Sequence, residues 1–416
     1  MKRRLLPILM TLVLVCALPI WAAFVTSGDV TNPLVCTAGA SEPNLQGMID
    51  RANAGDTIKL SSNTEIAATL QITKNLTLDL NGCVLRMRGT GSVLKVSDRA
   101  TLTITDSSAA KSGTITGGNA EDGGGVYVEA HATLEMTGGC ITGCRAEDGG
   151  GVYIDNNATL KMTGGCITDC HASYGGGGIY SYENLYMGGT AKIEKCTSKW
   201  GSDDAIWNRE RCNIYADGGT VDGTVNNQGT IRRSEGAAAE TVFNGTVYNR
   251  SAGTIIAGIY NETVENNGTI TGGTFWGTVT NKKSAWGNEA GTISGGTFAV
   301  RFDTGDGTKP EPTPVEHNRT VLRPTSDPEK SGHTFVGWYL GDALYDFNTP
   351  VTAPLTLTAR WEEVPSSGGN YYYHPTTDTK ADDTKGSPKT ADPGVALYGA
   401  LALLSLTGLT CTAKKR

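Results

Sequence analysis

The sequence contains one short phrase twice, with two cysteines at the same places in each copy. MTGGCITGC spans residues 136–144, and MTGGCITDC spans residues 162–170. Thiolates bind zinc and form disulfides, so the phrase is a candidate metal site or redox pair. A structural zinc site needs four sulfurs at about 2.3 Å from one ion. Most of a strand and a turn separate the cysteines of each phrase, which disfavours zinc.

The spacing of the phrases favours bonds between copies. If the copies stack as coils of β-strands, equivalent positions lie about 4.8 Å apart, inside the window of about 4.4–6.8 Å for disulfide Cα atoms. The candidate inter-coil disulfides are Cys140–Cys166 and Cys144–Cys170, with Cys196 as a rival partner for Cys170. The alternative is that Cys144, Cys170 and Cys196 are small buried side chains at a turn.

Carboxylates repeat as well. Glu121 and Asp122 open one copy, and Glu147 and Asp148 open the next. Four carboxylates at coil spacing are candidate ligands for calcium, which takes about six to eight oxygens. The third copy lacks the acidic pair, so the ladder stops after two coils. We therefore interpret these residues as solvated turn residues before a glycine bend.

Asp203 and Asp204, in GSDDAIWNRERC, interrupt the regular pattern and lie near Arg209 and Arg211. An irregular loop is the best remaining place for a catalytic site, although a salt-bridged loop explains the same residues. The sequence contains no nucleophile elbow and no zinc-protease motif. We therefore expect no enzymatic activity, no metal and no cofactor.

The elements that position these residues come from a repeat of constant period, strongest over residues 121–196. Each copy contains about three short runs in which apolar and polar residues alternate, the pattern of half-buried strands. Such a unit cannot bury its apolar face alone, so the copies must stack. Degenerate copies rich in glycine and threonine continue over residues 214–298. Residues 45–52 carry apolar side chains at helical spacing, which predicts a short helix that covers the open end.

The glycine- and threonine-rich coils, such as GGTVDGTVNNQGTI and EAGTISGGTF, resemble those of secreted bacterial proteins of the pectin-lyase-like superfamily. The resemblance covers residues 44–298, including the helical cap. It implies an all-β fold, a right-handed parallel β-helix or solenoid. It says almost nothing about activity, because a fold does not set a function.

Residues 299–362 differ in character, with more proline and more aromatic side chains. The motifs HTFVGWY, YDF and LTARW resemble the Listeria–Bacteroides repeat, the B-repeat of internalins. The resemblance implies one small β-grasp-like module of the kind found in surface proteins. We expect its aromatic residues to form a core rather than a ligand site.

Both ends of the chain resemble processing signals. Residues 1–22 combine a basic start, an apolar helical run and small residues, the pattern of a secretory signal peptide. Residues 363–389 form a polar stretch, which predicts a disordered linker. Residues 387–416 resemble a Gram-positive sorting signal, in which an apolar run over residues 395–411 predicts a transmembrane helix before a basic tail.

The pentapeptide of this sorting signal consists of Ser387, Pro388, Lys389, Thr390 and Ala391. Pro388 and Thr390 match the LPxTG pattern, whereas Ser387 and Ala391 replace its leucine and glycine. The resemblance implies that a sortase is a transient partner, which cuts after Thr390 and joins the chain to the cell wall. A plain membrane anchor is the alternative.

The net charge of −7 disfavours nucleic acid as a partner. Together these features predict a secreted protein tethered to the cell wall or membrane of a Gram-positive bacterium. We expect a non-catalytic adhesion, interaction or display role, with a host or matrix glycan or protein as ligand. The alternatives are a polysaccharide-active β-helix lyase or hydrolase, and a passive spacer that spans the wall.

Overall fold

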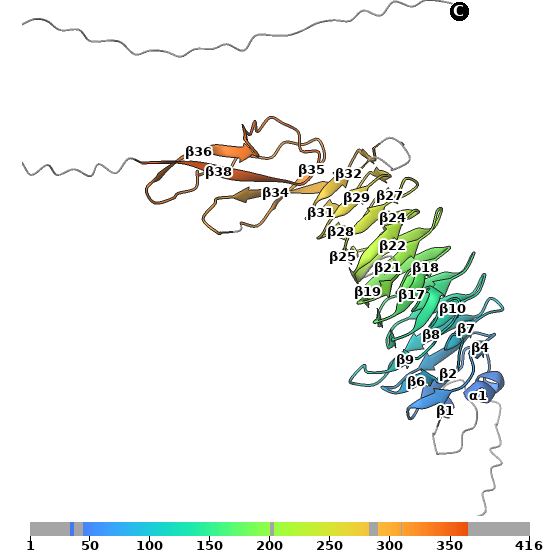
Figure 1. Cartoon of the computed structure of the whole chain (residues 1–416). Helices are drawn as coiled ribbons and strands as arrows, with labels where there is room; N and C mark the ends of the chain where they lie inside the picture. The colour runs from blue at the N-terminus through green and yellow to red at the C-terminus, as the bar shows by residue number, and fades with distance from the viewer. Residues whose placement is uncertain (1–33, 37–44, 200–203, 283–289, 309, 365–416) are drawn as a thin grey trace, which may run out of the picture. The chain divides into compact units, whose positions relative to one another are not determined.

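The computed structural model describes residues 34–36, 45–199, 204–282, 290–308 and 310–364. Within these ranges the regular secondary structure is nearly all β-strand, with one short helix. The strands stack in parallel, each in register with the strand one coil further along (Figure 1). This arrangement is a parallel β-helix, which confirms the predicted all-β solenoid. The predicted signal peptide, sorting signal and transmembrane helix lie outside the described residues, as does the predicted linker apart from residues 363 and 364, of which Glu363 ends a strand.

Each coil contributes strands to three faces. The first face consists of β1 (Leu34–Cys36), β2 (Thr57–Leu60), β5 (Leu76–Asp79), β8 (Thr101–Thr105), β11 (Thr133–Met136), β15 (Thr159–Met162), the first halves of β19 (Asn184–Glu194) and β22 (Asn213–Asp222), β24 (Thr230–Arg232), β27 (Thr254–Ile255), β30 (Thr269–Ile270) and β33 (Thr292–Ile293). The second face consists of β3 (Thr64–Ile66), β6 (Val84–Met87), β9 (Thr114–Thr116), β12 (Cys140–Thr142), β16 (Cys166–Thr168), the second halves of β19 and β22, β25 (Val242–Phe243), β28 (Ile259–Tyr260) and β31 (Thr274–Phe275).

The third face is a separate sheet of ten parallel strands. In spatial order these are β4 (Leu70–Ile72), β7 (Leu94–Val96), β10 (Val126–Val128), β14 (Val152–Ile154), β18 (Ile179–Ser181), β21 (Asp204–Asn208), β23 (Thr224–Asn227), β26 (Val247–Asn249), β29 (Val264–Asn266) and β32 (Val279–Asn281). A short sheet of β13 (Arg145–Asp148), β17 (His171–Gly175) and β20 (Thr197–Ser198) precedes it in the central coils.

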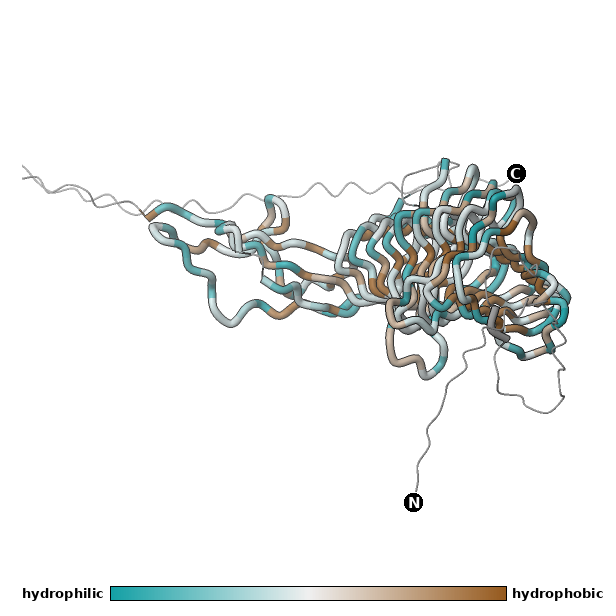
Figure 2. The backbone as a smooth tube through the Cα atoms, turned by 90° about the horizontal axis from the view of Figure 1, so that it is seen from below, coloured by the Kyte–Doolittle hydropathy of each residue, from teal (hydrophilic) through white to brown (hydrophobic). Residues whose placement is uncertain are grey.

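The core is a set of columns in which like side chains stack on like. Leu134 lies between Leu102 and Leu160 in the first face, and all three are fully buried. Hydrophobic segments recur at the same place in successive turns (Figure 2). Alternation along each strand puts every second residue inside, and each fully buried leucine contributes about 1.5–3 kcal/mol to folding. Stacking therefore supplies the burial that one coil alone lacks.

The corners between the first two faces depend on glycine. Gly165 has φ of 76°, a left-handed conformation, and a Cβ placed on it would lie 2.5 Å from the carbonyl oxygen of Gly139 in the preceding coil. Only glycine adopts this backbone without strain and without displacing its neighbour. The repeated Thr-Gly-Gly of each phrase is therefore a tight corner between strands.

The later coils have different interiors. A column of buried aromatic rings is stacked at centroid distances of 4.9–5.4 Å, and consists of Phe243, Tyr260, Phe275 and Phe298. A column of amides runs along the third face, each Nδ2 donating to the next Oδ1 at 2.7–2.8 Å, and consists of Asn208, Asn227, Asn249, Asn266 and Asn281. These two columns take the place of two of the aliphatic columns of the earlier coils.

Helix α1 (Leu45–Arg51) covers the first coil. Leu45 and Ile49 are buried beneath it. The Gln46 side chain forms the two hydrogen bonds that a neighbouring strand would form with β4. Its Oε1 accepts from the backbone amide of Gln71 at 2.7 Å, and its Nε2 donates to the backbone carbonyl of Gln71 at 3.1 Å. This pairing satisfies backbone groups of β4 at the open edge of the third face.

The last described residues form a small mixed sheet in the order β35, β34, β38, β36, β37. Its strands are β34 (Thr297–Asp303), β35 (Thr313–Glu316), β36 (His333–Leu340), β37 (Ala343–Leu344) and β38 (Leu355–Glu363). The first and last long strands, β34 and β38, pair in parallel at its centre, and the others pair antiparallel. Its core contains Trp338 with Phe302 and Phe335 packed edge-on at 4.9 and 5.4 Å.

The β-helix and this module share a strand. Thr297 and Phe298 of β34 pair in parallel with Thr274 and Phe275 of β31, and β34 then continues into the module. The boundary predicted between residues 298 and 299 therefore falls inside a strand. Backbone hydrogen bonds run through the junction, and no linker separates the two parts.

Candidate functional site

The cysteines of the repeated phrase lie in two different environments. Cys140 and Cys166 are directly opposite each other on β12 and β16, with Cα atoms 4.5 Å apart, and they form a disulfide. Their side chains are half-buried on the outside of the second face. The bond joins neighbouring coils, as the spacing of the two phrases predicts.

Cys144 and Cys170 are free and fully buried, so the second inter-coil disulfide that the sequence predicted is absent from the structure. Each thiol donates to the carbonyl two residues before it, at 3.5 Å for Cys144, and at 3.3 Å for Cys170 and for Cys196 of the next coil. The residue before each thiol has positive φ, which turns the side chain inward. Those residues are Gly143, Asp169 and Lys195.

These buried thiols match the alternative interpretation of small core residues at a turn. The hydrogen bond with Cys170 and the burial of the side chain raise the pKa of Cys144 well above its ordinary value. A thiol that stays protonated is a poor nucleophile and a poor metal ligand. Within the described ranges, no group of three or more His, Cys, Asp or Glu residues is arranged to hold a metal ion.

The irregular loop at Asp203 and Asp204 is described only in part. Asp203 lies outside the described residues. Asp204 is 3% exposed at the start of β21, where Oδ2 accepts from the Gly176 amide at 3.0 Å and Oδ1 accepts from Asn226 at 3.4 Å. Arg209 points elsewhere, donating to the Tyr180 hydroxyl at 2.9 Å. Burial raises the pKa of Asp204, and these bonds partly oppose the rise, so the carboxylate fastens two coils together.

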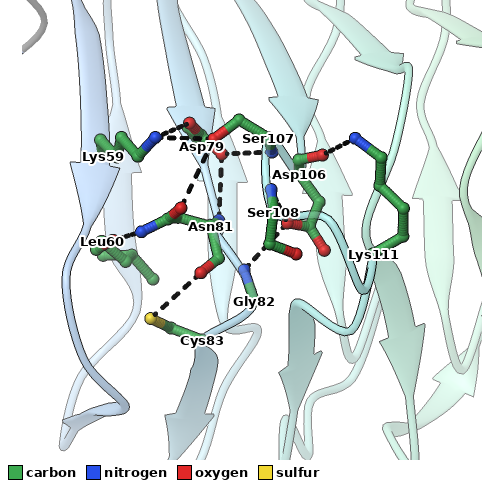
Figure 3. Close-up of polar contacts among 10 residues, drawn as sticks. All are labelled: Lys59, Leu60, Asp79, Asn81, Gly82, Cys83, Asp106, Ser107, Ser108 and Lys111. Carbon is green, nitrogen blue, oxygen red and sulfur yellow. Dashed lines mark hydrogen bonds and ion pairs between the residues drawn. The ribbon is translucent and has the colours of Figure 1, made fainter.

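Two further buried carboxylates, Asp79 and Asp106, lie at neighbouring corners of the early coils (Figure 3). Asp106 accepts from the amides of Gly82 at 2.8 Å, Ser108 at 3.0 Å and Gly113 at 2.6 Å. Burial alone would raise the pKa of Asp106, but these bonds lower it below its ordinary value. With its oxygens occupied by backbone donors, this carboxylate is structural.

A ladder of aromatic side chains on the outside of the third face is the strongest candidate for a site. Tyr127, Tyr153, Tyr180 and Trp207 occupy the same register position on β10, β14, β18 and β21. Their successive ring centroids lie 5.4, 5.7 and 6.3 Å apart. Tyrosine and tryptophan are enriched at binding surfaces, because they combine a large apolar ring with a polar group. We call this row the tyrosine ladder.

Carboxylates flank the tyrosine ladder. Asp122 and Asp148 stack by a parallel bridge at the corner before it, as the sequence repeat predicts. Asp155 comes directly after β14, and its carboxylate accepts a hydrogen bond from the Tyr127 hydroxyl at 3.1 Å. Desolvation, and then the charge of Asp148 and other nearby acids, raise the pKa of Asp122 to about 6. A carboxylate with a raised pKa beside aromatic rings is a recognised mark of a functional site.

A shallow depression of about 630 Å³ begins at the Tyr127 end of the ladder. Its lining includes Gln71, Lys95 and Tyr127, which occupy the same register position on β4, β7 and β10, together with Glu121 and Asp122. The depression and the ladder place aromatic rings, carboxylates and one lysine on a single surface. Such a surface binds a ligand by contact and charge rather than by covalent chemistry.

Sequence reasoning found the carboxylates but missed the ladder. The signal was present, because VYV, VYI, IYS and IWN stand at equivalent places in successive coils. Only the register of the third face shows that these rings lie outside, in contact, and beside the acidic corner. The pentapeptide Ser387–Ala391 lies outside the described residues. No helix in the described part of the chain is long and apolar enough to cross a membrane.

Comparison with known proteins matches residues 298–360 to the Listeria-Bacteroides repeat domain, which confirms the predicted repeat. Two relatives come from Evansella cellulosilytica. One, named as a Gly-rich membrane protein, is 35% identical over 69 residues, or 16% of this chain and 8% of the relative. The other, named as a membrane protein, is 38% identical over 69 residues, or 16% of this chain and 10% of the relative. The chain thus spans a tenth or less of these relatives. No solved structure matches it significantly.

Proposed function

We propose that this protein is a non-catalytic binding protein displayed on the surface of a Gram-positive cell. The observation that carries the proposal is the tyrosine ladder, a row of four aromatic side chains beside a depression, in which Tyr127, Tyr153 and Trp207 are partly exposed and Tyr180 is buried at 5% exposure. Three partly exposed aromatic rings in one row leave apolar surface in contact with water, and such a surface favours a partner. The β-helix holds this row on rigid, hydrogen-bonded strands.

Surface display follows from the resemblance of the chain's ends to processing signals and is supported by the Listeria-Bacteroides repeat and by relatives named as membrane proteins. In this proposal a sortase joins Thr390 to the cell wall. The test is cell fractionation of a Gram-positive host that expresses the whole chain. We expect the protein in the wall fraction, and Thr390→Ala to move it to the membrane or medium. Equal wall attachment of both forms would contradict sortase anchoring.

The binding role is tested by adhesion. Cells that display the whole chain should adhere to host cells or to a matrix protein or glycan, and cells that display Tyr153→Leu should adhere less. A matched control is Tyr215→Leu, because Tyr215 stacks on Tyr186 at 4.2 Å on the first face, away from the ladder. Equal adhesion by ladder-variant and parent cells would exclude the ladder as the binding surface.

The main alternative is a polysaccharide-active enzyme of the β-helix type. Asp203 and Asp204 are the residues that the sequence favours for this role. The oxygens of Asp204 accept from Gly176 and Asn226 inside the fold. Release of unsaturated or reducing sugar ends from a polysaccharide panel, lost in Asp204→Asn, would establish the enzyme. The passive spacer predicts neither adhesion nor sugar release.

A further inference from the structure

Cations of the chain itself already lie on the rings of the third face. Lys95 Nζ is 5.4 Å from the ring centroid of Tyr127, and the Arg209 guanidinium is 4.9 Å from that of Tyr182. Further along, the Arg250 guanidinium is 4.8 Å from the centroid of Tyr248. A cation over an aromatic face within about 6 Å is attracted by the ring quadrupole. This face therefore favours ammonium and guanidinium groups.

Tyr153, in the middle of the ladder, is the exception. It contacts the rings of Tyr127 and Tyr180, and the tilted ring of Tyr182 lies 5.9 Å away. Among the described residues no cation lies over Tyr153, although its side chain is only half-buried. Tyr153 is therefore partly exposed and, among the described residues, has no cation of the chain over its ring, unlike Tyr127 and Tyr182.

Carboxylates lie near this rung, whereas the nearby cations, Lys95 and Arg209, lie on the neighbouring rings. Burial and the nearby carboxylates of Asp122 and Asp155 raise the pKa of the Tyr153 hydroxyl, so it stays neutral. The Asp122 carboxylate forms no ion pair with the described residues, whereas Glu129 on the same face pairs with Lys95 at 3.2 Å. The charged groups near Asp122 are the carboxylates of Glu121, Glu147, Asp148 and Asp155, together with Lys95, which lines the same depression. A cation placed here gains attraction from several carboxylates.

We propose that Tyr153, Asp122 and Asp155 form a subsite for a lysine or arginine side chain of a partner's basic polypeptide segment. The inference rests on the proposed binding role and names the chemistry of the ligand. A polypeptide fits better than a single small cation, because the partly exposed ring of Tyr127 and the depression beside it extend the surface from Tyr153. Charge complementarity and the chain's own lysine and arginine contacts identify the occupant.

The test measures binding of a fluorescein-labelled octalysine peptide to the full-length chain, purified in mild detergent, by fluorescence anisotropy at low ionic strength. We expect Tyr153→Leu, which keeps a strand-compatible apolar side chain, to weaken binding about fivefold. The matched control Tyr215→Leu should leave it unchanged. Circular dichroism of each variant should match the parent, which separates lost binding from lost folding.

Asp122 gives an independent arm. Because its pKa is about 6, its carboxylate is charged at pH 7.5 and largely protonated at pH 5. We expect Asp122→Asn to weaken peptide binding about threefold at pH 7.5 and to have no effect at pH 5. Equal loss at both pH values would indicate a packing role for Asp122 and overturn its assignment to the subsite.

Two outcomes would overturn the proposal as a whole. In the first, octalysine does not bind, whereas octaglutamate or a neutral N-acetylglucosamine oligomer binds to the parent and not to Tyr153→Leu. The proposed ligand class would then be wrong, and the proposed binding role would stand. In the second, octalysine binds equally to parent and Tyr153→Leu, which would make the contact non-specific. If octalysine binds specifically but cells that display the protein do not adhere, the subsite is supported and the proposed adhesion role is contradicted.

Discussion

The early and late coils of the β-helix solve the same packing problem with different chemistry. Early corners are held by buried carboxylates, Asp79 and Asp106, which accept from backbone amides. Late coils have a column of amides, in which Asn249 bonds to Asn227 and Asn266 at 2.8 and 2.7 Å. A carboxylate accepts but cannot donate, whereas an amide does both. Amides therefore form a continuous ladder between coils, and carboxylates serve separate corners.

Coil length differs with the chemistry. In the third face Val126 pairs with Val152, whereas Val264 pairs with Val279, so the later coil closes with a much shorter stretch of chain. Short coils leave no room for long loops, and their interior is filled by stacked rings such as Tyr260. One backbone arrangement thus accepts different columns, provided that each column is the same kind of side chain on successive rungs.

The largest expected effect comes from breaking the aromatic column of the late coils. Phe275 is fully buried between Tyr260 and Phe298. Phe275→Ala leaves a cavity between two rings and should cost about 3–5 kcal/mol in the free energy of unfolding. Urea unfolding of the full-length chain measures it, with the outward-facing Tyr248→Ala as the control. A loss no larger than that of Tyr248→Ala would refute the column as the source of stability.

The amide ladder is the next test. Asn249→Ala removes hydrogen bonds to both neighbouring rungs and leaves buried groups without partners, which should cost about 3 kcal/mol. The control is Asn244→Ala, because Asn244 belongs to an exposed ladder with Asn261 at 2.7 Å. The same urea experiment distinguishes them. Equal costs would mean that burial of the ladder has no energetic importance.

Low pH should weaken the carboxylate-held corners of the early coils more than the amide column of the late coils. The pKa of Asp106 is lowered in the fold, so its contribution to stability is present above the unfolded value of 3.8 and is lost as pH falls through the folded value. Asp106→Asn replaces an acceptor by a donor that faces backbone amides, and should cost about 2 kcal/mol at pH 7. At pH 2 the variant and the parent should be closer in urea midpoint. A constant difference across this range would contradict the electrostatic origin.

The smallest effect has the opposite sign and comes from Asp122, which flanks the tyrosine ladder. Asp122 has a raised pKa of about 6, so its charge opposes folding above that pH and the penalty disappears towards the unfolded value of 3.8. Asp122→Asn should stabilise the protein by about 1 kcal/mol at pH 7.5, after screening by solvent, and not below pH 4. Glu121→Gln, at an exposed position, is the control. Destabilisation at pH 7.5 would show a structural role.

The cysteines illustrate how far sequence reasoning reached. Equal spacing made Cys140–Cys166 and Cys144–Cys170 equivalent candidates. The structure joins the first pair and leaves the second free, because a left-handed residue turns Cys144 and Cys170 into the core. The spacing of the repeat determines which residues are neighbours on successive coils. The direction of a side chain at a corner depends on the local backbone conformation, which cannot be read from the spacing.

The sequence by itself determined the stacked coils, since a repeat of short alternating runs buries its apolar face only against another copy. It also determined the surface-protein module, through HTFVGWY and LTARW. Tertiary structure alone decided that β34 belongs to both parts, and that Tyr153 lies beside Asp122 on an outer face. The reason is physical: periodicity specifies which residues face inward, whereas corner geometry and register specify which outward residues meet.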